Sequence, residues 1–159
     1  MKKLICLIFM IAAMTAVTLA PAASAATDDG SSISGTGRGS FPGGATLGAV
    51  DLRGFDMAAG LFTEQDGSAA GVFHLVLEGS TTLGQMRRIT LEGNVKQGTA
   101  SPAGGGSFSG LASIDFGDDA PTVSGVPFNV ETSAGSMVFT IQSTALPAAT
   151  LNTGGLTIE

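Results

Sequence analysis

The chain has one histidine, His74, and histidine is the side chain most often used as a general base near neutral pH. A Ser-His-Asp hydrolase would also need its serine on a Gly-x-Ser-x-Gly turn, which the sequence lacks. Zinc sites use several His or Cys ligands, and the only cysteine is Cys6. His74 stands between Phe73 and Leu75 in an alternating stretch, so we expect it at the surface with no catalytic role.

Paired carboxylates are the second chemistry that the residue types allow, because two of them can hydrolyse a glycosidic bond. Asp51, Asp56, Glu78 and Glu92 are candidates by type. Sugar sites also use flat aromatic side chains, and the chain has neither Trp nor Tyr. A small carboxylate-dependent hydrolase therefore stays as an alternative and not as the main interpretation.

The densest acidic cluster is the segment 115–119, with the sequence Asp-Phe-Gly-Asp-Asp. Carboxylates on a tight turn can bind calcium, but the spacing of an EF-hand loop is absent. Asp and Gly are also favoured in solvated hairpin turns for backbone reasons. The sequence favours such a turn and leaves open whether Asp115, Asp118 and Asp119 bind calcium.

Three alternating glycines, Gly35, Gly37 and Gly39, are similar in spacing to the start of a phosphate-binding loop. That loop requires a helix immediately after it, whereas Pro42-Gly43-Gly44 follows here. We expect a glycine-rich strand that passes close to another backbone. The sequence therefore predicts no catalytic, cofactor-binding or metal-binding residue, and no cofactor.

The first 25 residues predict an export signal. Lys2 and Lys3 precede an apolar run from Leu4 to Leu19, and Ala23-Ser24-Ala25 matches a signal-peptidase site. We expect cleavage before Ala26, a flexible lead-in over residues 26–32 and one domain over residues 33–159. The predicted location is extracytoplasmic, either periplasmic or secreted.

Removing 25 of the 159 residues leaves 134, which is one domain by length. The signal takes two of the seven Lys and Arg residues and none of the thirteen Asp and Glu, so the net charge becomes −8. A negative charge repels nucleic acid and anionic lipid surfaces. We expect no nucleic-acid partner and no membrane insertion of the mature chain.

Alternating apolar residues predict strands along the whole domain. The pattern is clearest at 73–77, 108–116, 126–130, 137–142 and 156–158, and weaker at 33–41, 47–57 and 86–95. Turn residues separate these stretches, among them Asp66-Gly67, a pair typical of tight hairpins. About eight antiparallel strands predict an all-β fold, a single β-barrel or a barrel-like sandwich.

Glycine-rich stretches recur at residues 35–41, 106–112 and 154–158, with a short alternating segment at 126–130. In this order of segments the chain resembles small exported glycine-rich all-β proteins of bacteria that have no assigned function. The resemblance implies a compact β domain and no catalytic residue.

We therefore expect an exported, non-enzymatic β domain with a binding or structural role. One alternative is a barrel that binds a small apolar ligand in a cavity beside the small residues Gly110 and Ala112. A protein partner is equally open, as is the oligomeric state.

Overall fold

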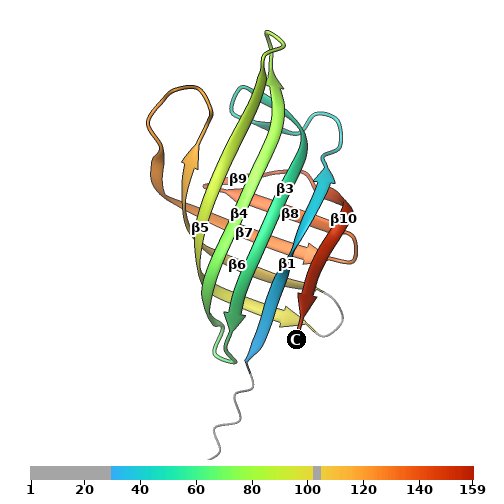
Figure 1. Cartoon of the computed structure of the whole chain (residues 1–159), viewed down its shortest axis with the longest axis vertical. Helices are drawn as coiled ribbons and strands as arrows, with labels where there is room; N and C mark the ends of the chain where they lie inside the picture. Colours follow the sequence, from blue (N-terminus) through green and yellow to red (C-terminus); the bar gives the residue numbers. More distant parts are fainter. Residues whose placement is uncertain (1–29, 102–104) are drawn as a thin grey trace, which may run out of the picture.

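The computed structural model describes residues 30–101 and 105–159, so the expected export signal and its cleavage site lie outside the described residues. Every regular element in the described part is a β-strand, which confirms the all-β class (Figure 1). The strands are β1 (Ser31–Ser40), β2 (Thr46–Leu47), β3 (Val50–Thr63), β4 (Ser68–Thr81), β5 (Met86–Ser101), β6 (Gly105–Asp115), β7 (Val123–Ser133), β8 (Ser136–Ile141), β9 (Thr144–Ala145) and β10 (Ala149–Ile158).

All ten strands belong to one antiparallel sheet in the order β1-β10-β8-β7-β6-β5-β4-β3-β2, with β9 beside β8. β1 has two long partners, since it pairs with β10 along one edge and with β3 along the other. In Figure 1 the strands β1, β3, β4 and β5 run along the long axis, and β6, β7 and β8 cross behind them. The sheet thus has two layers that face each other across the interior.

Each of the eight expected strands is present, and the two extra strands are only two residues long. The expected strand at 47–57 is divided: β2 ends at Leu47, and β3 begins at Val50. Gly48 lies between them with a φ of 60°, a conformation that glycine adopts without steric cost. The Asp66-Gly67 pair does form the β3–β4 hairpin turn, and Gly67 has a φ of 83°.

Proline within a strand is expected on an edge strand or at a bulge. Pro127 is not on an edge strand, but it does lie beside a bulge. β7 lies inside the sheet, between β6 and β8. Pro127 pairs with Leu111 next to a register shift in the β6–β7 ladder, and its carbonyl accepts the Gln142 N–H (2.8 Å). The proline is therefore accommodated where the regular ladder ends.

Six phenylalanine rings fill the interior between the two layers. Phe55 and Phe139 pack edge to face with centroids 5.0 Å apart, and Phe73 stacks on Phe128 at 5.5 Å. The complete set of mutually packed rings is Phe41, Phe55, Phe73, Phe108, Phe128 and Phe139. Edge-to-face and offset contacts of this kind stabilise a core beyond the burial of apolar area alone.

The space for one of these rings, Phe128 of β7, comes from a glycine on β5, two strands away in the sheet. A Cβ atom on Gly93 of β5 would lie 2.6 Å from Cε1 of Phe128, so the ring occupies the place of a side chain. Gly110, from which the sequence suggested free space, instead lies against the backbone: its Cβ would be 2.0 Å from the Asn94 carbonyl oxygen. Ala112 is buried in the core cluster.

Candidate functional site

His74 lies on the outer face of β4, exposed to solvent as expected. The strand register places Glu92 directly opposite His74, and Ser113 on the far side of Glu92. Nucleophilic catalysis needs the histidine next to the serine, with the acid behind the histidine. Here the carboxylate stands in the middle, so this row is not arranged as a Ser-His-acid triad.

The carboxylate candidates Asp56 on β3 and Glu78 on β4 are each held by an arginine. Arg38 binds Asp56 at 2.5 Å, and Arg88 binds Glu78 at 3.0 Å. Hydrogen bonding from Arg38 lowers the pKa of Asp56, and the same bond raises the pKa of Arg38. A general acid in glycoside hydrolysis needs a raised pKa, so this environment acts against that role for Asp56.

The two remaining carboxylates of that set are Asp51 and Glu92. Asp51 is exposed near the start of β3 and is opposite Thr46 and Ser80, while Glu92 is exposed on β5.

The acidic segment 115–119 forms a turn after β6. Asp115 accepts the Gly117 N–H at 2.8 Å, and Asp118 accepts the Ala120 N–H at 3.2 Å. Asp119 has a φ of 61°, a left-handed conformation that Asp tolerates. No group of three or more His, Cys, Asp or Glu side chains that could hold a metal ion occurs within residues 30–101 and 105–159.

The alternating glycines 35, 37 and 39 lie inside β1, as the expectation of a close backbone approach requires. A Cβ on Gly39 would be 2.3 Å from the Thr150 carbonyl oxygen and 2.4 Å from the Phe55 ring. These glycines therefore serve the packing of β1 against β10 and the core.

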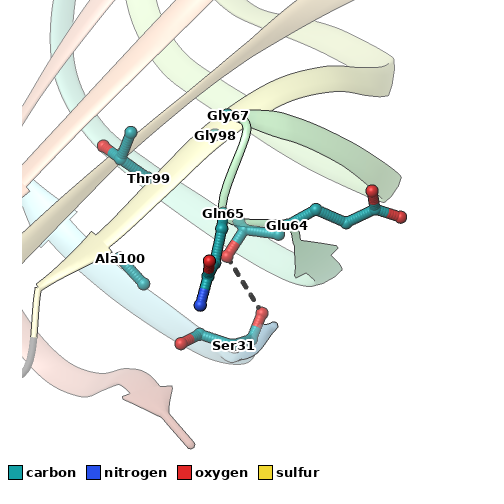
Figure 2. A pocket seen from close by; sticks show the side chains of 8 residues that line it. Ser31, Glu64, Gln65, Gly67, Gly98, Thr99 and Ala100 are labelled. Carbon is teal, nitrogen blue, oxygen red and sulfur yellow. Dashed lines mark hydrogen bonds between the residues drawn. The ribbon is translucent and has the colours of Figure 1, made fainter. Parts of the chain in front are cut away.

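A polar depression lies at the β3–β4 hairpin, where the start of β1 and the end of β5 come together (Figure 2). It has a volume of about 220 Å³. Its lining consists of Ser31, Thr63, Glu64, Gln65, Gly67, Gly98, Thr99 and Ala100. A second depression of about 320 Å³ shares Gly67, Gly98 and Thr99 and continues toward Ser107 and Asn129.

Hydrogen bonds fix the hairpin that forms this depression. The Glu64 N–H donates to the Ser68 carbonyl (2.8 Å), and the Gly98 N–H donates to the Gly67 carbonyl (3.1 Å), which ties β5 to the turn. The buried Thr63 hydroxyl donates to the Ser31 carbonyl at 3.1 Å and so joins β3 to β1. The wall of the depression is thus held by three strands.

The groups that line the depression are hydroxyls, amides and backbone atoms, with carboxylates only at its rim. In Figure 2 the Glu64 side chain points away from the cavity, whereas the Gln65 side chain points toward Ser31. The Ser68 hydroxyl and backbone N–H lower the pKa of Asp66, whose carboxylate accepts that N–H at 2.8 Å. Such a surface can exchange hydrogen bonds with a neutral polar ligand and supplies no activated nucleophile.

Comparison of the chain with protein-family models, curated proteins and solved structures gave no match. Among the described residues, no helix has the length and hydropathy that crossing a membrane would require.

Sequence reasoning identified the Asp66-Gly67 turn but not the depression around it. The three strands that meet there are far apart in the chain: Ser31, Thr63 and Gly98 belong to β1, β3 and β5. No pattern within a single segment of the sequence predicts that these three strands meet. The one usable signal was the small size of residues 98–101, which allows strands to approach closely at this point.

Proposed function

We propose that the chain is an exported, non-enzymatic β-barrel domain with a binding role. The barrel rests on β1, whose residue Thr36 is opposite Ala58 of β3 and also opposite Gly155 of β10. Pairing on both edges of β1 connects the first strand of the order to β3, the last long strand at its other end. Closure pairs most of the strand edges that a glycine-rich sheet without disulfides would otherwise expose, and within the described residues the outer edge of β10 after Leu151 stays open.

The positions of the ionisable groups whose pKa values are shifted support the non-enzymatic part of the proposal. Arg38 lowers the pKa of Asp56 within an exposed ion pair, and Ser68 lowers the pKa of Asp66 within a turn. Catalytic groups usually have pKa values shifted toward neutrality in a cleft. The ionisable groups here support structure, which favours binding over catalysis.

The alternative of an apolar ligand inside the barrel requires space among the inward side chains. The six packed rings, with centroid separations of 5.0 to 6.5 Å, favour a filled interior instead. The polar depression at the β3–β4 hairpin is therefore the better candidate binding site.

Mass spectrometry under native conditions tests the export and the binding together. The full chain is expressed in bacteria, and the protein is recovered from the periplasm and the medium. We expect a polypeptide of residues 26–159, with a copurifying molecule as additional mass. An unprocessed chain in the cytosol would contradict the export.

NMR tests the closure of the barrel, and activity assays test the absence of catalysis. Closure predicts cross-strand contacts from Thr36 to both Ala58 and Gly155, and the absence of either set would indicate an open sheet.

Hydrolysis of chromogenic glycosides that is lost in Asp56→Asn would support the hydrolase and overturn the non-enzymatic proposal.

A further inference from the structure

The edge of β10 that faces away from β1 changes its environment partway along the strand. At its start β10 pairs with β8, through Ala149 opposite Met137 and Thr150 opposite Ser136. The last bond on this side is from the Leu151 N–H to the Gly135 carbonyl, at 3.0 Å. Beyond it, no residue within 30–101 or 105–159 pairs with this edge. In Figure 1, β10 continues past this point toward the C-terminal label.

The backbone hydrogen bonds show which residues present their N–H and C=O groups on that edge. Ser32 and Glu159 exchange two backbone bonds of 2.8 and 3.0 Å, so they are a hydrogen-bonded pair of the β1–β10 ladder. Such pairs alternate in an antiparallel ladder. The N–H and C=O groups of Thr157 therefore point toward β1, and those of Leu156 and Ile158 point away from it.

A groove of about 300 Å³ runs beside these outward groups. On the β10 side it is lined by Leu151, Leu156 and Ile158, which also pack against the hydrophobic core. On the other side it is lined by the β7–β8 hairpin, including Thr132 and Ser136. None of the side chains that line it is ionisable.

We propose that this edge groove binds a single extended, uncharged peptide segment of another protein, which pairs with β10 as an added strand. Outward backbone groups at alternate residues are what strand addition uses for affinity, and apolar pockets beside them select alternate side chains. The neutral lining favours a segment without charges. This groove is separate from the polar depression at the β3–β4 hairpin, so the proposal adds a second site to the binding role proposed above and rests on that role.

The shape of the groove favours a single segment over the sheet of a second copy. A strand that pairs with β10 has the β7–β8 hairpin along its other side. If the added strand were the edge of a folded sheet, the next strand of that sheet would occupy the same space as the β7–β8 hairpin. A single segment has no such neighbouring strand, so it avoids this overlap.

Amide exchange measured by NMR on the purified protein tests the proposal directly. The probe is an acetylated and amidated peptide, Thr-Val-Thr-Val-Thr-Val-Thr. In the free protein we expect the Leu156 and Ile158 amides to exchange much faster than the Thr157 amide, which β1 protects. Saturating peptide should slow the Leu156 and Ile158 amides at least tenfold. The same peptide with N-methyl groups on its pairing edge should leave them unchanged.

A matched pair of variants tests the backbone contact. Leu156→Pro removes the outward N–H without removing a β1–β10 bond, and we expect at least a tenfold loss of peptide affinity by fluorescence anisotropy. Leu156→Val keeps the N–H and should bind within about threefold of the parent. If Leu156→Pro fails to fold by circular dichroism, the exchange experiment decides alone.

Three results would overturn the proposal. The Leu156 and Ile158 amides could be protected already in the free monomer, or the peptide could leave their exchange unchanged at millimolar concentration. Protection that rises with protein concentration alone, together with a dimer mass, would assign the groove to a second copy. None of these results bears on processing at residue 26, so failure here is distinguishable from failure of the export proposal.

Discussion

The contact between Gly93 and the Phe128 ring gives the sharpest test of the core. In Gly93→Ala the new Cβ would lie 2.6 Å from Cε1 and 2.8 Å from Cζ of Phe128. Carbon atoms in contact are separated by about 3.5 to 4.0 Å, so the ring has to move by about 1 Å. Its stack on Phe73 opposes that movement. We expect a loss of about 1–3 kcal/mol in the free energy of unfolding.

A double-mutant cycle isolates this contact. Phe128→Leu removes the ring and is itself destabilising, but the space it leaves can take the methyl group that Gly93→Ala adds in the double variant. We expect Gly93→Ala with Phe128→Leu to be more stable than the sum of the single losses by about 1 kcal/mol or more. The free energies come from urea unfolding followed by circular dichroism, where the midpoint and slope are fitted together.

Two other glycines serve as matched controls. Gly60 has no atom within 4 Å of its Cβ position, so Gly60→Ala should be neutral or stabilising by up to about 1 kcal/mol. A Cβ on Gly79 would be 2.3 Å from the Asp51 carbonyl oxygen, so Gly79→Ala should destabilise, and Phe128→Leu should not relieve it. If Gly93→Ala leaves the free energy of unfolding unchanged, or if the cycle gives no coupling energy, then the Phe128 ring does not occupy the space beside Gly93.

Other contacts lead to further expectations. Phe139 is fully buried and contacts three other rings, so Phe139→Ala should cost about 3–5 kcal/mol in chemical unfolding, and a loss below about 1 kcal/mol would argue against the ring cluster. Thr63→Val removes the hydroxyl bond to the Ser31 carbonyl and should cost about 1 kcal/mol, with faster amide exchange at the start of β1 as the second readout. Because Arg38 lowers the pKa of Asp56, the stabilisation from Asp56 is present above the unfolded carboxyl pKa and is lost as the pH falls through the lower folded value. Between pH 7 and pH 3 the urea midpoint should therefore fall further in the parent than in Asp56→Asn, and equal falls would contradict the pairing.

Local alternation was sufficient to predict the strands and the faces of their side chains. Met137, Phe139 and Ile141 are all buried, as a period of two requires, and His74 is exposed between two buried neighbours. These outcomes depend only on the geometry of a single strand, which turns successive side chains to opposite faces.

The contacts between strands could not be predicted in the same way. The pairing of Arg38 with Asp56, and of the Phe128 ring with Gly93, depends on register between strands that are distant in the chain. Register follows from the whole set of turns and bulges and is not written in any one segment. The last strand was also expected only at 156–158, because residues 152–155 have no apolar alternation and are held by backbone pairing with β1.

The partnership of β1 with β10 also governs the order in which the molecule can assemble. Ser34 meets Thr157, more than a hundred residues later in the chain, and folds built on such distant contacts form in milliseconds to seconds. β1 can join β3 early, but its second edge has no mate until β10 emerges. During synthesis the chain therefore stays unpaired along this edge of β1 until its last strand has been made.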